Sequence, residues 1–247
     1  MSVGKEELRK EIDGEPFFGE ALGFFFKCIT DFEGITVLDA GCGSGALSVY
    51  MALCGARVIG VDINKASLAR AQELSMRHGT QGRCVFTCSS MEHICVDDGS
   101  IDLIFSKSTL QYVDRTATLK EFSRVLRKGG DMVLVENLPY NPLINLFRLV
   151  RRIRARSPIQ IAYLKSIKGY ITFSEIKEIK THFKDCAQSE FNLFRTFALA
   201  IMRYLGDGKL SRVVDENVKA LDRAVIGSIP FANRLAWIEV LVCRGKK

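Results

Sequence analysis

Short apolar runs alternate with helix-period patterns along the first two thirds of the chain. Strands are predicted at residues 36–39, 57–61, 83–88, 101–105 and 132–136, and helices at 46–54, 65–78 and 118–127. The last of these helices is expected to end at the turn Lys128-Gly129-Gly130. Strands that are apolar on both faces and separated by helices are typical of a parallel sheet covered on both sides. The pattern therefore predicts an α/β fold with a doubly wound sheet.

The last third of the chain begins with an amphipathic pattern at residues 143–156. Its apolar stripe consists of Leu143, Leu146, Phe147, Val150 and Ile153, and its other side carries Arg148, Arg151, Arg152 and Arg156. The arginines fit the solvated face of a helix, contact with an anionic membrane surface, or contact with an acidic substrate or nucleic acid. The sequence leaves these three interpretations open.

Two further helices and two strands are predicted after this segment. Thr172 and Glu175 form a capping box for a helix that runs to about His182, and another apolar stripe covers residues 210–225. The β-like runs 186–194 and 234–243 could pair antiparallel at one edge of the sheet. The mostly helical stretch between them would then be an insertion.

The amino-acid composition is consistent with the predicted α/β fold. The chain has 247 residues, of which 47% are apolar and 26% charged, which excludes a disordered or fibrous protein. The eight cysteines include no CxxC pair, and no signal-peptide pattern precedes them, so they are interpreted as reduced, mostly buried thiols of a cytoplasmic protein. No metal site and no membrane-spanning segment are expected.

Candidate chemistry is concentrated in the stretch Val37-Leu38-Asp39-Ala40-Gly41-Cys42-Gly43-Ser44-Gly45, where a strand enters a glycine turn before a helix. The glycines allow the backbone to approach a ligand closely, and the helix N-terminus points amides at it. In an open α/β sheet, a nucleotide-like ligand binds at this place. Asp62, at the end of the next strand, fits an acid that binds a ribose.

Asp39 separates two cofactors that both fit this spacing. Its carboxylate would lie near the pyrophosphate of NAD and repel it, whereas it suits a ligand that carries an ammonium and a sulfonium. Asp39 therefore favours S-adenosylmethionine over NAD, and a NAD-dependent oxidoreductase remains an alternative.

With these residues the sequence resembles the class I S-adenosylmethionine-dependent methyltransferases, in particular the group that includes the ubiquinone and menaquinone biosynthesis enzymes and many small-molecule methylases. The resemblance covers about residues 35–137. Four motifs carry it in order: the glycine turn VLDAGCGSG, the strand Val58-Ile59-Gly60-Val61-Asp62, the strand entry Asp97-Asp98-Gly99-Ser100-Ile101-Asp102-Leu103-Ile104, and the segment Phe122-Ser123-Arg124-Val125-Leu126-Arg127-Lys128-Gly129-Gly130.

The resemblance implies roles for individual positions. Gly41, Cys42 and Gly43 would line the methionine part of the cofactor, with Asp39 near its amino group. Asp62 would bind both ribose hydroxyls, and Ile63 would pack on the adenine. Where the family often has an acid for the adenine amino group, this chain has Ser90 followed by Met91, which is a departure from the pattern. Ser106 would lie close to the transferred methyl group.

No residue in the sequence is identified as the catalytic base. The polar groups expected to face the acceptor are Lys107 and Tyr112, on the loop after the fourth strand, and Glu136 and Asn137, after the fifth. Because the sulfonium is a strong electrophile, alignment of the acceptor is the chief requirement.

The tetrapeptide Asn137-Leu138-Pro139-Tyr140 resembles a motif of the RNA adenine-N6 methyltransferases, and the net charge of +7 would suit RNA. In that family the tetrapeptide follows strand four, whereas here it follows the fifth predicted strand. It is therefore interpreted as a chance match, and nucleic acid as an unlikely partner.

The resemblance implies a Rossmann-like, seven-stranded mixed sheet with the last strand antiparallel and a helical cap. A single domain over residues 1–247 is expected, with an N-terminal helical lid at 1–33, a cofactor-binding core at 34–138, and cap insertions at 139–183 and 196–231. The phenylalanine-rich segment at 17–26 could be this lid or a helix docked on the core.

The predicted activity is methyl transfer to an oxygen, nitrogen or carbon of a small molecule under the cap. RNA adenine-N6 methylation and a non-catalytic module with the same fold are further alternatives.

Overall fold

The computed structural model describes residues 3–195, 198 and 208–247, so part of the predicted cap, at 196–197 and 199–207, lies outside the described residues. A seven-stranded sheet has the order β3-β2-β1-β4-β5-β7-β6. The strands are β1 (Thr36–Ala40), β2 (Arg57–Asp62), β3 (Cys84–Cys88), β4 (Ile101–Lys107), β5 (Leu126–Asn137), β6 (Phe183–Phe191) and β7 (Ile238–Lys246).

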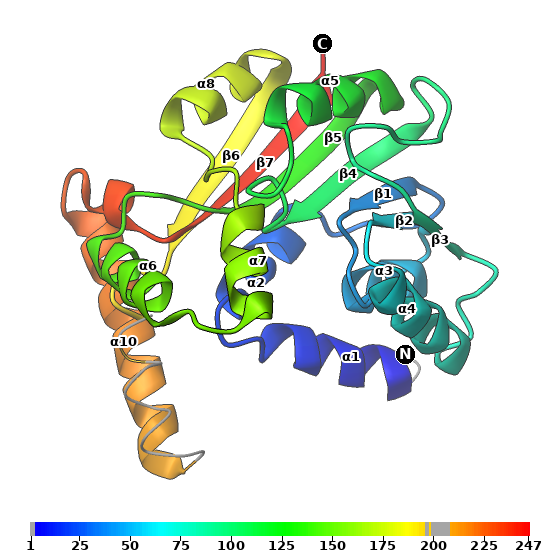
Figure 1. Ribbon diagram of the computed structural model, residues 1–247. Coiled ribbons are helices and arrows are strands. Elements are labelled where there is room, and N and C mark those ends of the chain that lie inside the picture. The colour runs from blue at the N-terminus through cyan, green and yellow to red at the C-terminus, as the bar shows by residue number, and fades with distance from the viewer. Residues whose placement is uncertain (1–2, 196–197, 199–207) are drawn as a thin grey trace.

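Strand β7 runs antiparallel to both of its neighbours, and the pairs among β1 to β5 are parallel. In Figure 1 the red β7 lies between the green β5 and the yellow β6. The prediction of a doubly wound mixed sheet with an antiparallel last strand is confirmed. The strand order reverses between β1 and β4, and in such sheets ligands bind where the order reverses.

Helices cover both faces of the sheet (Figure 1). The helices are α1 (Val3–Asp13), α2 (Gly19–Cys28), α3 (Ala46–Leu53), α4 (Lys65–Arg77), α5 (Arg115–Val125), α6 (Pro142–Arg154), α7 (Pro158–Ser166), α8 (Phe173–Thr181), α10 (Lys209–Ser228) and the short 3-10 helix η1 (Ala232–Leu235). Residues of α2, α3 and α4 share one core cluster with the sheet, and residues of α5 and α8 share the other.

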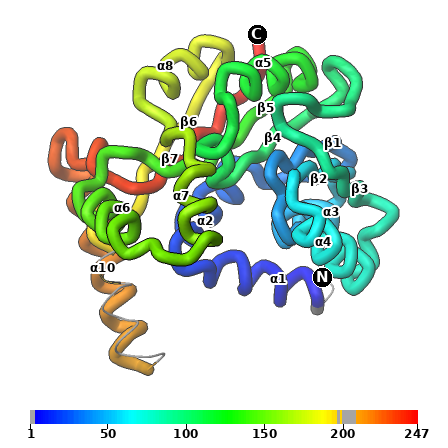
Figure 2. The backbone as a smooth tube through the Cα atoms, in the orientation of Figure 1, coloured from blue at the N-terminus to red at the C-terminus, as the bar shows by residue number. Residues whose placement is uncertain are grey.

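The N-terminal segment is docked on the core. Phe25 of α2 is fully buried, and its ring lies 4.8 Å from that of Phe105 on β4 and 4.5 Å from that of Phe26. Figure 2 shows α1 running along the same side of the molecule as α3, which it contacts. The phenylalanines at 25 and 26 are therefore core residues, as the second interpretation of this segment predicted.

The predicted end of the helix at 118–127 is wrong by two residues. Helix α5 ends at Val125, and Leu126 already has the extended backbone that begins β5. The segment Lys128-Gly129-Gly130 belongs to this strand, where the register with β4 shifts between Ile101 and Leu103. An irregular strand start leaves no signal in hydrophobic periodicity, because the extra residues interrupt the alternation.

Side-chain hydrogen bonds cap the first turns of α8 and α6. The side chains of Thr172 and Glu175 form the predicted capping box at the start of α8. Asn141 is the N-cap of helix α6, and its Oδ1 accepts a hydrogen bond from Ile144 N–H at 3.0 Å. Ile144 is the buried residue of α6, so most of its predicted apolar stripe lies open on the surface.

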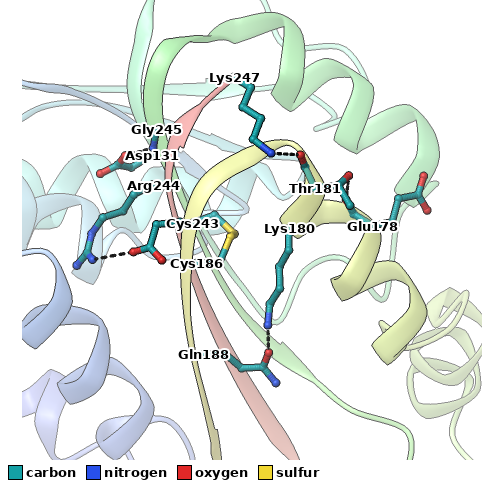
Figure 3. The surroundings of a disulfide bond; sticks show 11 residues. Asp131, Glu178, Lys180, Thr181, Cys186, Gln188, Cys243, Arg244, Gly245 and Lys247 are labelled. Atoms are coloured by element: carbon teal, nitrogen blue, oxygen red, sulfur yellow. Dashed lines mark hydrogen bonds and ion pairs between the residues drawn. A yellow bond between two sulfur atoms is a disulfide. The ribbon is translucent and has the colours of Figure 1, made fainter.

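The expectation that the cysteines are reduced and mostly buried is wrong for several of them. Cys186 on β6 and Cys243 on β7 are direct partners across the antiparallel pair, and they form a disulfide (Figure 3). Their Cα atoms lie 4.2 Å apart, although the two residues are separated by 57 positions in the sequence. The pairing register brings them together, and spacing in the sequence does not reveal it. Among the free cysteines, Cys84 is buried, whereas Cys88 and Cys95 are exposed.

The described residues contain neither a membrane-spanning helix nor a metal-binding cluster. None of their helices combines the length and the apolar character that crossing a membrane requires. They also contain no cluster of three or more histidine, cysteine, aspartate or glutamate side chains placed to hold a metal ion.

Candidate functional site

A glycine turn joins β1 to α3 and is bound to the end of β2. The N–H groups of Gly41 and Cys42 both donate to Val61 O, at 2.8 and 3.0 Å. Gly41, Gly43 and Gly45 all have positive φ, at 79°, 55° and 79°. A Cβ at Gly41 would lie 2.2 Å from Thr109 Cγ2, so this position requires glycine for both conformation and space. No atom lies within 4 Å of where a Cβ of Gly43 would stand, which leaves the turn open on that side.

Asp39 lies at the buried end of this turn and is only 3% exposed. Ser48 Oγ, on α3, donates to its Oδ2 at 2.5 Å. Burial raises the pKa of Asp39 to about 6, while the Ser48 hydrogen bond and the charge of Lys107 act in the opposite direction. Near neutral pH, Asp39 is therefore a buried carboxylate with one neutral hydrogen-bond donor, and it suits a cationic ligand group.

Asp62 holds the other end of the turn. Its Oδ2 accepts from Gly43 N–H at 2.9 Å, and its Oδ1 accepts from Asn64 N–H at 2.8 Å. Asp62 is half-buried, and the next residue, Ile63, is 75% exposed. The two residues place an acid and an apolar surface side by side at the carboxyl end of β2.

The predicted adenine contacts lie farther along the same edge. Ser90 is half-buried, and its Oγ donates to Glu92 Oε2 at 3.2 Å. Met91 is 8% exposed and packs in the core cluster that contains Val61. The Met91 side chain therefore contributes chiefly to the core.

A cavity of about 520 Å³ opens between the glycine turn and the N-terminal segment. Its lining includes four predicted cofactor residues, Asp39, Gly41, Cys42 and Gly43. Opposite them it is lined by Ile12, Glu15 and Pro16 from α1 and the connection to α2. Asp62, Ile63, Ser90, Met91 and Ser106 are not part of this lining.

Lys107 connects the two sides of the cavity. Its Nζ donates to both carboxylate oxygens of Glu15, at 2.8 Å each, and lies 5.0 Å from the ring centroid of Phe18. Lys107 was predicted to face the acceptor, and it does line the cavity. Its ammonium is engaged in an ion pair that fixes the N-terminal segment over the site.

A buried polar network lies behind the cavity. Ser106 Oγ and Thr109 Oγ1 are 2.5 Å apart, and Ser106 is fully buried. Glu136 Oε1 accepts from the N–H groups of Thr109 and Leu110, at 3.1 and 3.3 Å. Burial raises the pKa of Glu136 to about 7, although these backbone donors act against the rise. In this arrangement Glu136 holds the loop that follows β4.

The other two candidates near the acceptor are held by neighbours. Asn137 Nδ2 donates to Ser108 Oγ at 2.7 Å and to Gln111 Oε1 at 3.2 Å. Tyr112 Oη donates to Tyr163 Oη of α7 at 3.1 Å. Burial is the largest cause of a raised pKa at Tyr112, and this hydrogen bond is the second. The phenol therefore stays protonated near neutral pH.

The thiol of Cys42 is also kept protonated. Burial raises its pKa, and the nearby charges of Asp39 and Asp62 add to the effect. Cys42 can therefore line a pocket, but it is not placed to act as a nucleophile.

Sequence reasoning missed Glu15 and Thr109. Glu15 reaches Lys107 across 92 positions of sequence, and no local pattern indicates such a pair. Thr109 contacts the position of Gly41 and the hydroxyl of Ser106. The glycine at position 41 indicated that another group packs closely against this turn. The sequence did not indicate that this group is the Thr109 side chain.

Comparison with known proteins gives a consistent result. Residues 38–134 match the family model described as a methyltransferase domain. The malonyl-[acyl-carrier protein] O-methyltransferase of Hamiltonella defensa is 30% identical over 152 residues, which cover 61% of this chain and 53% of that protein. The ubiquinone biosynthesis O-methyltransferase of Bordetella bronchiseptica is 30% identical over 130 residues, or 52% of this chain and 53% of that protein. The chain thus spans about half the length of these curated relatives.

Solved structures share the fold over most of the chain. The geranyl diphosphate C-methyltransferase of Streptomyces coelicolor, in complex with S-adenosyl-L-homocysteine, aligns with a TM-score of 0.62 and 17% identity over 93% of this chain and 78% of that one. The phosphoethanolamine N-methyltransferase 2 of Haemonchus contortus, in complex with S-adenosyl-L-methionine, aligns with a TM-score of 0.61 and 20% identity, covering 97% of this chain and 56% of that one.

Proposed function

We propose that the chain, whose residues 38–134 match a methyltransferase domain, is a class I S-adenosylmethionine-dependent methyltransferase that transfers a methyl group from this cofactor to an oxygen, nitrogen or carbon of a small organic molecule. The observation that carries the proposal is the pair of carboxylates at the two ends of the glycine turn. Asp39 opens onto the cavity, and Asp62 is bound to the turn by Gly43 N–H at 2.9 Å.

The residues present fit S-adenosylmethionine. The open side of Gly43 leaves room for a ligand against the backbone, and the buried Asp39 carboxylate lacks a cationic hydrogen-bond partner of its own among the described residues. We assign Asp39 to the ammonium of the cofactor, Asp62 to its ribose hydroxyls and Ile63 to one face of its adenine. Ser90 and the backbone of Met91 complete the adenine end.

When bound, the cofactor supplies an electrophilic methyl group on a positively charged sulfur. The task of the chain is therefore to align the acceptor and to exclude water. Lys107 and Glu15 hold the N-terminal segment across the cavity, and Glu136 holds the loop that carries Tyr112. In this proposal Glu136 and Lys107 position elements of the site, and Ser106 supports the same loop through its contact with Thr109.

A small acceptor fits this arrangement better than RNA does. The N-terminal segment covers the cavity from one side, which narrows access to the glycine turn. In the tetrapeptide at 137–140, the Asn137 amide is occupied by Ser108 and Gln111, and the Tyr140 ring stacks on Phe173 at 4.8 Å. Neither side chain is free to grip a target base.

A labelled-methyl assay tests the proposal. The wild type is incubated with methyl-labelled S-adenosylmethionine and a cell extract that is separated afterwards into small molecules, RNA and protein. We expect label in the small-molecule fraction, a loss of roughly tenfold or more in Asp39→Asn, and no loss in Asp31→Asn, an exposed aspartate remote from the turn. Label confined to RNA or protein would contradict the substrate class, and no transfer at all would favour the non-catalytic module.

A further inference from the structure

Helices α6 and α7 present an outer surface that the rest of the described molecule leaves open. Helix α6 buries only Ile144, and no residue of α7 is buried. The side chains of Leu146, Phe147 and Ile153 on α6 and of Ile159 on α7 are 59, 60, 73 and 83% exposed. Aliphatic and aromatic side chains this exposed, and this close together in the chain, indicate a binding surface. These four residues, with the arginines described next, are called the α6–α7 surface.

The charge of the α6–α7 surface has a single sign. From Asn137 to Ser174 the sequence contains no aspartate or glutamate, and it contains five arginines and two lysines. Arg151, Arg152, Arg154 and Arg156 are exposed, and no carboxylate among the described residues forms an ion pair with any of them. The apolar residues are therefore interleaved with cations that have no carboxylate partner among the described residues, although the Arg151 guanidinium lies 4.4 Å from the ring centroid of Tyr163.

The inner sides of the two helices are fixed to the body of the molecule. The guanidinium of Arg148 lies 3.6 Å from the ring centroid of Tyr170, and Tyr163 of α7 is hydrogen-bonded to Tyr112. These contacts hold α6 and α7 in place, so their outer side chains form a defined surface. In Figure 1, α6 lies at the periphery of the fold, away from the helices that cover the sheet.

Three kinds of partner differ in how well they fit the α6–α7 surface. A nucleic acid would bind the arginines but would gain little from exposed Leu, Phe and Ile side chains. A second copy related by a twofold axis would place the acid-free patch against itself, cation against cation. A bilayer with anionic lipids satisfies both features, because apolar side chains enter the boundary between headgroups and acyl chains while arginines bind lipid phosphates.

We propose that the α6–α7 surface binds the surface of an anionic lipid bilayer. The apolar side chains of Leu146, Phe147, Ile153 and Ile159 enter the headgroup region, and Arg151, Arg152, Arg154 and Arg156 contact lipid phosphates. The proposal concerns binding alone and stands independently of the proposed reaction.

Vesicle flotation with purified full-length protein tests the proposal. The wild type is expected to float with mixed phosphatidylcholine–phosphatidylglycerol vesicles, to stay behind with phosphatidylcholine alone, and to be released by salt. Arg152→Gln combined with Arg154→Gln should weaken binding by roughly 10- to 30-fold, since each cation contributes about fivefold, equivalent to about 1 kcal/mol. Phe147→Ser combined with Ile153→Ser should weaken binding at every salt concentration.

Matched controls come from α4, on another part of the surface. Met76→Ser changes a side chain that is 61% exposed, and Arg70→Gln with Arg77→Gln removes the same charge as the arginine pair. Both control variants should float like the wild type. Circular dichroism of each variant confirms that the fold is retained.

Three outcomes would overturn the proposal. The first is a wild type that fails to float with anionic vesicles. The second is binding that depends on the arginines but is unchanged by Phe147→Ser with Ile153→Ser and is competed by RNA, which would assign the surface to nucleic acid. The third is self-association, measured by light scattering, that the same serine variants abolish, because the surface would then bind a second copy.

Discussion

At the scale of single residues, Asp39 shows how the site differs from the rest of the core. Its carboxyl is 3% exposed, and burial raises its pKa from 3.8 to about 6. A carboxyl with a raised pKa contributes its stability below the unfolded pKa and loses it as pH rises through the folded value. Around neutral pH, ionised Asp39 therefore destabilises the fold, and a cationic ligand would offset that cost.

This environment predicts how cofactor affinity depends on pH. We expect the affinity of the wild type for S-adenosylhomocysteine to be nearly constant just above pH 7, where the ligand still carries its ammonium, and to fall as pH drops through about 6, because protonated Asp39 no longer attracts that ammonium. Asp39→Asn should bind roughly tenfold or more weakly at pH 7.5, with a flatter profile below it. The check is calorimetric titration at a series of pH values, and parallel profiles for the two proteins would contradict this role of Asp39.

At the scale of elements, the glycine turn is the part of the site that the sequence predicted best. The sequence signal for this turn is local, because consecutive residues form the end of a strand, three glycines with positive φ and the start of a helix. The acid at Asp62 is equally local, since it ends the next strand. Contacts between residues that lie far apart in the sequence were not predicted. The register of β6 against β7 pairs Cys186 with Cys243, and Glu15 forms an ion pair with Lys107. Hydrophobic periodicity along the chain indicates neither contact.

Gly41 gives a prediction about the turn as an element. Gly41→Ala should lower the free energy of unfolding by about 2–4 kcal/mol, because the residue has a φ of +79° and the new Cβ would lie 2.2 Å from Thr109 Cγ2. Gly34→Ala is the matched control: Gly34 has a φ of +73° with no atom within 4 Å, so only the backbone cost of about 1–2 kcal/mol is expected.

Chemical denaturation measures both variants. The double variant Gly41→Ala with Thr109→Ser, which removes the clashing methyl and keeps the hydroxyl, should recover part of the loss. Equal destabilisation by Gly41→Ala and Gly34→Ala would show that close packing by Thr109 is unimportant.

At the scale of the whole molecule, the sheet order explains why the site lies where it does. The order reverses between β1 and β4, and Asp39, Gly41 and Lys107 all come from the carboxyl ends of these two strands. The N-terminal segment then covers one side of the cavity, and α7 contacts the loop after β4 through Tyr163. The sequence predicted the sheet and its parallel core from hydrophobic pattern. It could not predict that the apolar stripe of α6 stays exposed, because amphipathic periodicity does not specify which partner a face meets.

We propose that this chain binds S-adenosylmethionine through the turn between Asp39 and Asp62. The most direct test is calorimetric titration of S-adenosylhomocysteine into the wild type, Asp62→Ala and Asp31→Ala, with NAD as the control ligand. Asp31 Oδ1 accepts from Glu33 N–H at 2.9 Å, much as Asp62 Oδ1 accepts from Asn64 N–H, so Asp31→Ala removes the same local bond away from the site.

We expect tight binding to the wild type and to Asp31→Ala, affinity lower by roughly tenfold or more for Asp62→Ala, which corresponds to about 1.5–3 kcal/mol, and no binding of NAD. A wild type that binds NAD more tightly than S-adenosylhomocysteine, or that binds neither, would contradict the account.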